Sequence, residues 1–215
     1  MLAYFRRDLL RILEGWLAGF RSGGAGERGP EARLGWALIL GTIPAGIVGL
    51  AAKDWISTYG RDPQLIATTA IVYGLLLGVA DRFGKRRLGL PAIGPREGLL
   101  IGCAQALALV PGTSRSGVTM TAALGLGLDR SSAARFSFLL SVPVGLLVGA
   151  KQVVDFARGE IVGLDGSIVL LGVAVSAAAG YAVIAALLAW VKTRPLALFA
   201  VYRVLLGLFL FYSFS

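Results

Sequence analysis

The sequence has no histidine and only one cysteine, Cys103, among its 215 residues. Without histidine, the chain lacks the side chain that most often serves as a general base or metal ligand near neutral pH. A single cysteine excludes a disulfide-stapled secreted protein, and its apolar neighbours favour a packing role. Charged residues make up 15% of the chain, against about 25% in typical soluble domains. A soluble globular enzyme is therefore disfavoured.

Acidic residues are also scarce, with 12 Asp and Glu against 21 Lys and Arg, and none lies inside a long apolar run. The net charge of +9 could suit nucleic acid, but basic, aromatic-interleaved patches and recognition motifs do not occur. An excess of Lys and Arg is instead typical of cytoplasmic loops of membrane proteins. We expect no nucleic-acid partner.

Hydrophobic residues dominate, at 56% of the chain and a mean hydropathy of +0.76. Several apolar runs approach the roughly 20 residues that a spanning helix needs. The sequence predicts an all-α polytopic membrane protein, with residues 1–215 forming one transmembrane domain. The five spans are expected at 34–52, 64–80, 134–150, 167–191 and 196–214.

Residues 1–33 form a basic amphipathic N-terminal segment. Apolar residues such as Phe5, Leu9 and Ile12 recur at helical spacing up to residue 21, with arginines on the other face. This pattern predicts a helix lying in the membrane interface, followed by a Gly-rich connector at 22–32.

The region 97–128 is predicted to form a re-entrant helical hairpin. Its apolar halves, 97–110 and 118–128, are each too short to cross a bilayer. Between them lies the polar sequence PGTSRSG at 111–117. Irregular backbone at membrane depth survives only where protein or water satisfies its polar groups.

The basic residues favour this hairpin and orient the chain. With a re-entrant region, most Lys and Arg residues share the side of the N-terminal segment, which predicts a cytoplasmic N-terminal segment and a C-terminus outside. The opposite side then holds only Lys53, Arg61, Lys151 and Arg158.

Arg115 lies in the hairpin, where an arginine costs at least about 2.5 kcal/mol on insertion scales. It could bond backbone carbonyls or an acid at a span end such as Glu97, or it could hold an anion from outside the chain. Binding of an external anion is favoured, because glycines permit a tight turn, the Ser and Thr hydroxyls can donate hydrogen bonds to an anion, and the start of a helix attracts negative charge. The expected phosphate-binding residues are Gly112, Thr113, Ser114, Arg115, Ser116, Gly117 and Thr119.

Two further polar residues lie in apolar segments and could support this site. Gln105 could line the cavity, but a bond across helices is the preferred interpretation. For Arg203, snorkelling or bonds to carbonyls are favoured over a second contact to the same anion.

Three segments together resemble the undecaprenyl-diphosphatases, the bacitracin-resistance family: ALVPGTSRSGVTM (108–120), ARFSFLLSVPVG (134–145) and FAVYRVLLG (199–207). The resemblance implies a bacterial inner-membrane enzyme with an inverted-repeat fold. Such an enzyme hydrolyses undecaprenyl diphosphate to the monophosphate and so recycles the lipid carrier for cell-wall synthesis. It also implies that Arg115 grips the diphosphate, with Ser114 and Thr119 as supporting catalytic donors.

The family's first signature, two glutamates four residues apart followed by a Ser-Ser/Thr-Gly-His stretch, has no match here. Glu27 and Glu31 have the spacing but lie in the Gly-rich connector. The sequence therefore resembles a member lacking one hairpin and most of one helix. The resemblance implies a divalent cation, Mg²⁺ or Ca²⁺, but no ligands for it are identifiable. The chain by itself is expected to bind the lipid without turning it over.

Two other functions remain open. A non-catalytic polyprenyl-phosphate binder or flippase would use the same cradle, and a small-ion transporter would use a broken-helix site. The lack of membrane-depth acids disfavours the transporter. The expected partners are a polyprenyl diphosphate lipid, the membrane and, as a candidate, a second copy of the chain.

Overall fold

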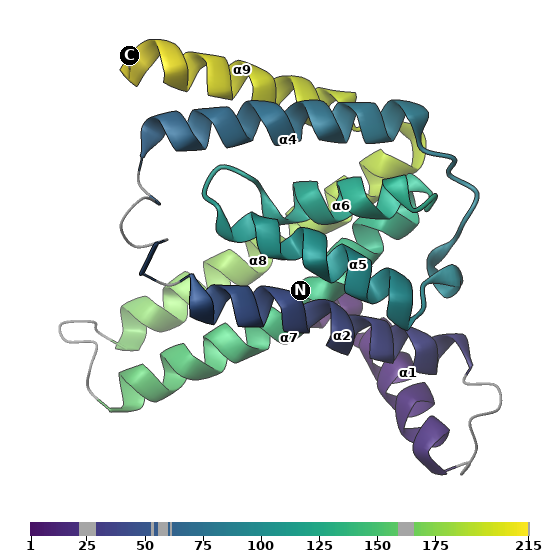
Figure 1. Cartoon of the computed structure of the whole chain (residues 1–215). Helices are drawn as coiled ribbons and strands as arrows, with labels where there is room; N and C mark the ends of the chain where they lie inside the picture. Colours follow the sequence, from purple (N-terminus) through teal and green to yellow (C-terminus); the bar gives the residue numbers. More distant parts are fainter. Residues whose placement is uncertain (22–28, 53, 56–59, 61, 159–165, 215) are drawn as a thin grey trace.

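The computed structural model describes residues 1–21, 29–52, 54–55, 60, 62–158 and 166–214. Within these ranges the chain forms α-helices and two short 3-10 turns, with no β-strand, so the prediction of an all-α protein is confirmed. Figure 1 shows the arrangement. The helices are α1 (Leu2–Arg21), α2 (Pro30–Ala51), α4 (Pro63–Phe83), α5 (Pro95–Ala106), α6 (Arg115–Gly125), α7 (Arg130–Ala157), α8 (Gly166–Thr193) and α9 (Ala197–Phe214).

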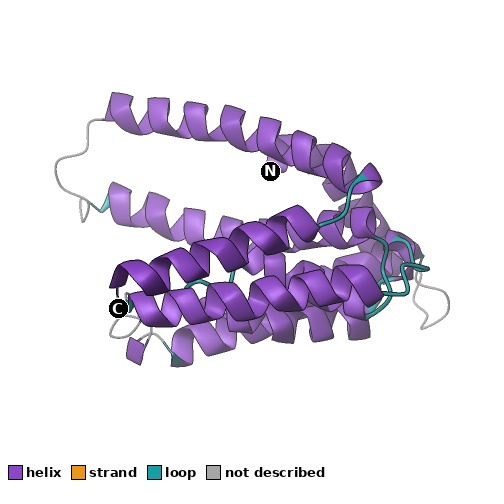
Figure 2. Cartoon of the chain, turned by 90° about the horizontal axis from the view of Figure 1, so that it is seen from above, coloured by secondary structure: helices purple, strands orange, loops and turns teal. Residues whose placement is uncertain are grey.

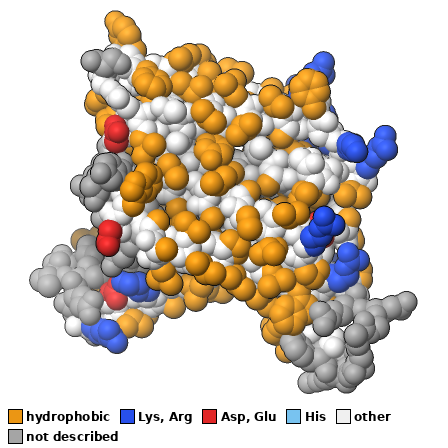
Figure 3. Space-filling model, viewed as in Figure 1, with side chains coloured by type: hydrophobic (Ala, Val, Ile, Leu, Met, Phe, Trp, Pro, Cys, Tyr) orange, Lys and Arg blue, Asp and Glu red, His pale blue; other side chains and the backbone are white. Residues whose placement is uncertain are grey.

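Five of these helices, α2, α4, α7, α8 and α9, are long and apolar enough to cross a membrane. Figure 3 shows hydrophobic side chains over the middle of one face, with Lys and Arg side chains towards its right edge and lower left. This distribution fits a bundle whose middle faces lipid and whose ends face water. The protein is a multi-pass membrane protein.

The helix α1 forms as its amphipathic pattern predicts and packs mainly against α2. Its apolar residues Phe5 and Ile12 are buried in the core of the bundle. Asp8 accepts a hydrogen bond of 2.8 Å from the Arg135 guanidinium of α7. These contacts hold α1 against the bundle through both its apolar face and one charge. Most of the predicted connector, residues 22–28, lies outside the described residues.

Several helices extend beyond the apolar runs in the sequence. The helix α7 begins at Arg130, because the Asp129 carboxylate accepts from the Ser132 backbone N–H at 2.9 Å and caps it. It continues through Pro143 to Ala157. Polar first turns of this kind are invisible to hydropathy, which is why the third span was expected only from residue 134.

The helices α5 and α6 form a hairpin that enters and leaves at the same end of the bundle (Figure 1). The Arg87 and Leu88 N–H groups, before α5, donate to the Gly127 carbonyl, after α6, at 2.9 and 3.0 Å. The Asp129 N–H returns a bond to the Leu88 carbonyl. These bonds tie the two ends of the hairpin together, as a re-entrant hairpin requires.

Glycines allow α5 to pack directly against the backbone of α2. A Cβ added at Gly98 would overlap the backbone of Ala37, and one added at Gly102 would overlap the backbone of Gly41. Small residues let membrane helices approach closely in this way. The position of the hairpin therefore depends on these glycines.

Replacing Gly102 with valine is expected to lower the stability of the folded chain by about 1–3 kcal/mol, because the added side chain forces α5 away from α2. The measurement is the thermal unfolding midpoint in detergent. The matched control is Gly149→Val on α7, where a Cβ meets open space. Equal midpoints for the two variants would contradict the argument.

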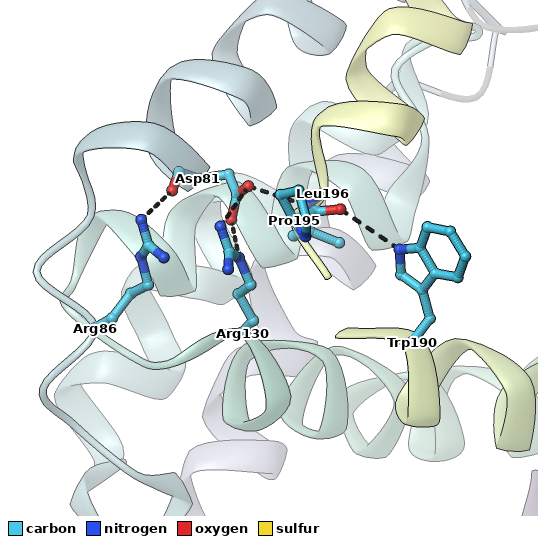
Figure 4. Close-up of polar contacts among 6 residues, drawn as sticks. All are labelled: Asp81, Arg86, Arg130, Trp190, Pro195 and Leu196. Atoms are coloured by element: carbon cyan, nitrogen blue, oxygen red, sulfur yellow. Dashed lines mark hydrogen bonds and ion pairs between the residues drawn. The ribbon is translucent and has the colours of Figure 1, made fainter. Parts of the chain in front are cut away.

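A buried carboxylate joins three helices at the end where the hairpin enters (Figure 4). Asp81, at the end of α4, is 3% exposed and forms an ion pair with Arg130 of α7. Its Oδ2 atom also accepts from the Leu196 N–H, just before α9, at 2.9 Å. Arg86 donates to the Asp81 carbonyl at 2.8 Å. Asp81 thus fixes the starts of α7 and α9 relative to α4.

The helix α8 stands apart from the other helices over most of its length (Figure 2). Its buried residues, Ile184, Leu188 and Val191, all lie in its last turns. Most of α8 therefore presents apolar side chains outward.

Candidate phosphate site at the hairpin turn

The turn between α5 and α6 is held from one side by α4 and α9. The Thr69 hydroxyl of α4 donates to the Pro111 carbonyl at 2.6 Å, and the Arg203 guanidinium of α9 donates to the Gly112 carbonyl at 2.7 Å. Gly112 has a φ of 84°, which favours glycine. The turn is thus fixed by side chains from two spanning helices.

Ser114 ends the turn in a strained backbone conformation. Its φ of 63° is uncommon for a residue with a side chain. Its hydroxyl accepts from the Gly117 N–H at 3.3 Å and caps the start of α6. Strain of this kind persists only where the surrounding structure imposes it, and it concentrates at functional sites.

Arg115 is held by neutral groups. Its Nε atom donates to the Gln105 side-chain oxygen at 3.0 Å, and an Nη atom donates to the Leu140 carbonyl of α7 at 3.2 Å. Glu97, one acid considered as its partner, instead accepts from the Gly94 N–H at the start of α5. Neither Gln105 nor the Leu140 carbonyl carries a negative charge that would neutralise the guanidinium.

Gln105 acts as both a bridge between helices and a wall of the site. Its amide nitrogen lies 3.4 Å from the Gly41 carbonyl of α2, to which it donates, while its oxygen accepts from Arg115. The expected bond across helices is therefore present. The same contacts orient the Arg115 guanidinium, because one amide group joins α2, α5 and α6.

Arg115 lines a cavity of about 450 Å³ between α2, α5 and α7, here called the Arg115 cavity. Its walls are apolar except for Thr42, Gln105, Arg115 and Lys151. Lys151 forms an ion pair with Asp155 one turn further along α7. The Arg115 cavity therefore combines two cationic side chains with an apolar wall.

A second cavity of about 460 Å³ lies on another side of the turn, between α4, α6 and α9, and is here called the Arg203 cavity. Its residues are wholly different from those of the Arg115 cavity. Five of the residues singled out in the sequence line it: Gly112, Ser114, Ser116, Gly117 and Arg203. The residues expected to form one cradle are thus divided between two cavities.

Two of the expected donors line neither cavity. The Thr119 hydroxyl is buried 2.7 Å from the Ser137 hydroxyl of α7, and it donates to the Arg115 carbonyl. Thr113 is fully buried, and its hydroxyl has no hydrogen-bond partner. Thr119 therefore joins α6 to α7, and its hydroxyl is committed to protein groups.

Sequence analysis did not identify Thr69 or Lys151 as parts of the site. Thr69 carries no signal beyond its place in an apolar run. The predicted span 134–150 ends just before Lys151, although α7 continues through it. The i,i+4 spacing of Lys151 and Asp155 is the one signal that could have extended the helix.

The residues around the turn do not fit a divalent cation bound directly by the protein. Mg²⁺ and Ca²⁺ prefer carboxylate ligands, and no acidic side chain of the described residues lines the Arg115 or the Arg203 cavity. Across the part of the chain that the structure describes, no group of three or more His, Cys, Asp or Glu could hold a metal ion.

The chain matches a known family over nearly its whole length. The family described as "Bacitracin resistance protein BacA" matches residues 1–209. The chain is 46% identical over 212 residues to the undecaprenyl-diphosphatase of Magnetococcus marinus, covering 98% of this chain and 78% of that protein.

Two other relatives have similar sequence identity and coverage. The undecaprenyl-diphosphatase 1 of Pseudoalteromonas translucida is 44% identical, covering 96% of this chain and 76% of that protein. The undecaprenyl-diphosphatase of Nitrosococcus oceani is 43% identical, covering 100% and 80%. A family match over nearly the whole length, together with a hairpin turn that presents an arginine to an apolar cavity, shows that the chain belongs to the BacA family of bacitracin resistance proteins.

Proposed function

We propose that the chain hydrolyses undecaprenyl diphosphate to undecaprenyl phosphate and inorganic phosphate, and so recycles the lipid carrier used in cell-wall synthesis. The observation that carries this proposal is Arg115, a cation in the wall of an apolar cavity whose hydrogen bonds, among the described residues, all go to neutral groups. The names of the relatives, undecaprenyl-diphosphatase, support it.

The cavity matches a ligand with an anionic head and an apolar tail. A guanidinium can bond two phosphate oxygens at once, and the attraction is strong where water is scarce. Lys151 also lines the Arg115 cavity, but its charge is already paired with Asp155, so Arg115 is the cation that faces the diphosphate. The apolar walls suit a prenyl chain.

The reaction transfers the terminal phosphoryl group to water. Water attacks the terminal phosphorus, the bond between that phosphorus and the bridging oxygen breaks, and the lipid monophosphate leaves. Negative charge gathers on the phosphoryl and bridging oxygens in the transition state, where a fixed cation is most effective. Arg115 is the proposed catalytic residue that neutralises this charge.

The proposed roles of the other turn residues follow from their contacts. Ser114 caps α6 and so holds the first turn that carries Arg115. Gln105 orients the guanidinium. Thr119 is a positioning residue, because its hydroxyl already bonds protein groups and supports the diphosphate site only through α6.

The proposal replaces the binding without turnover that the missing first signature suggested: the purified chain in detergent is expected to release phosphate from undecaprenyl diphosphate, with undecaprenyl phosphate as the other product. Equal amounts of the two products would show that the linkage between the two phosphates is hydrolysed, and not the bond between carbon and oxygen. Binding of the diphosphate without release would overturn the hydrolase proposal in favour of a non-catalytic polyprenyl-phosphate binder or flippase. Adding EDTA tests the divalent cation that the resemblance implies: loss of release that Mg²⁺ or Ca²⁺ restores would establish the requirement.

The proposed setting is the bacterial inner membrane, with the N-terminal segment in the cytoplasm and the C-terminus outside. The excess of Lys and Arg on the N-terminal side supports this orientation. The proposed partners are the lipid diphosphate, the membrane and, as a candidate, a second copy of the chain. The mass of the detergent-solubilised protein tests the last of these.

A further inference from the structure

We propose that the Arg203 cavity is a second ligand site, which binds an isoprenyl monophosphate separately from the diphosphate in the Arg115 cavity. The inference rests on the proposed function, because hydrolysis produces a ligand of this chemistry inside the same protein. It assigns a binding role to a cavity and an arginine that the hydrolysis itself does not use.

The first observation is the state of the Arg203 side chain. The residue is 8% exposed and lines the cavity. One of its Nη atoms donates to the Gly112 carbonyl, but its buried Nε atom has no hydrogen-bond partner among the described residues. A buried donor without an acceptor is costly. An anion bound in the cavity beside this guanidinium would balance its charge.

The second observation is the start of α6, which faces the same cavity. This helix has 11 residues, and Ser116 and Gly117 in its first turn line the cavity together with Arg203. A Cβ at Gly117 would lie 3.1 Å from an Nη atom of Arg203. Glycine therefore lets the guanidinium approach the positive end of the helix, and the two favour an anion at one place.

The remaining wall of the cavity is apolar. Leu77 comes from α4, Leu187 from α8, and Phe199 and Leu206 from α9. Among the described residues, no acidic side chain lines the cavity, and Arg203 is the one charged side chain that does. The cavity therefore matches one phosphate group joined to an apolar chain.

The two cavities lead away from the turn along different helices. The Arg115 cavity is lined by the last two turns of α2 and the second half of α7. The Arg203 cavity reaches from Ile66 to Leu77 on α4 and down to Leu196 before α9, near the Asp81 ion pair. A lipid monophosphate held there would lie on the other side of the turn from the diphosphate.

The test is photolabelling of the 215-residue chain in detergent with a farnesyl monophosphate that carries a benzophenone at its apolar end. Peptide mass spectrometry then identifies the labelled helices. We expect labels on α4 and α9, reduced at least tenfold by unlabelled farnesyl monophosphate but not by farnesol or inorganic phosphate. Protection by inorganic phosphate alone would overturn the proposal, because the site would then take the free ion.

Variants identify the cation that holds the probe. Arg203→Gln is expected to reduce the label on α4 and α9 at least tenfold, and Arg203→Lys to retain part of it. Arg115→Gln and the exposed Arg96→Gln on the same hairpin are expected to leave that label in place. Leu206→Trp narrows the apolar end while leaving the arginine, and is expected to weaken labelling too. Labels confined to α2 and α7, or unchanged in Arg203→Gln, would overturn the proposal.

The two proposals fail in different ways. Phosphate release from the diphosphate without Arg203-dependent labelling would refute only the second site. Arg203-dependent labelling by the monophosphate without any phosphate release would refute only the hydrolysis and retain the site.

Discussion

Replacing Arg115 with alanine is expected to lower phosphate release from undecaprenyl diphosphate by about 100- to 1000-fold. Loss of one preorganised donor to the transition state typically has an effect of this size. The effect should appear mainly in kcat/KM, since the guanidinium contacts the diphosphate in both the ground and the transition state. The assay is steady-state release of phosphate in detergent, with circular dichroism to show that the helices remain.

Arg115→Lys keeps the charge but is expected to recover only a small part of the activity. Lysine cannot bond Gln105 and the Leu140 carbonyl while offering two parallel donors to a phosphate. The matched control is Arg96→Ala, which removes an exposed arginine from the other end of the hairpin and should keep nearly full activity. If Arg115→Ala and Arg96→Ala released phosphate equally well, Arg115 would have no role in the reaction.

Replacing Asp81 with alanine is expected to destabilise the folded chain by about 3 kcal/mol. Breaking a buried ion pair usually costs 3–5 kcal/mol, because one charge is left uncompensated. We expect a loss at the lower end of this range because Arg130 is partly exposed and water can solvate its unpaired charge. The buried Leu196 N–H also loses its acceptor, which adds to the loss of stability. The measurement is the thermal or denaturant midpoint in detergent.

A milder change at Asp81 separates charge from hydrogen bonding. Asp81→Asn keeps an oxygen that can accept from Leu196 or Arg130, so it should destabilise less than Asp81→Ala. The matched control is Asp62→Ala, at the other end of α4, where an exposed carboxylate only caps the helix. That loss should cost about 1 kcal/mol. Equal midpoints for Asp62→Ala and Asp81→Ala would show that the buried pair contributes little.

Much of the fold follows from the order of residues along the chain. Spanning helices are recognisable because a bilayer demands long apolar runs, and the hairpin is recognisable because its two runs are short and flank a polar turn. The ends of the helices are harder to predict from the sequence. The beginning of α7 depends on the cap at Asp129, and Lys151 belongs to α7 although it follows the apolar run.

The sequence predicts part of the candidate site. Arg115 stood out because a cation in an apolar run is rare and costly, and the structure places it in a cavity between α2, α5 and α7. The separation of Arg115 from Ser114 and Ser116 was not expected. Neighbours in a tight turn point in different directions, and sequence spacing alone does not say which helix each will face.

The sequence by itself determined that the protein is helical and embedded in a membrane, and that the turn at 111–117 carries a rare buried cation. These properties depend on local composition and on the length of apolar runs, which the chain carries wherever it folds. Only the tertiary structure decided that the turn separates two cavities, with Arg115 in one and Arg203 in the other. That division depends on where α2, α4 and α9 pack around the hairpin, and residues distant in sequence, such as Gly41, Thr69 and Arg203, make those contacts.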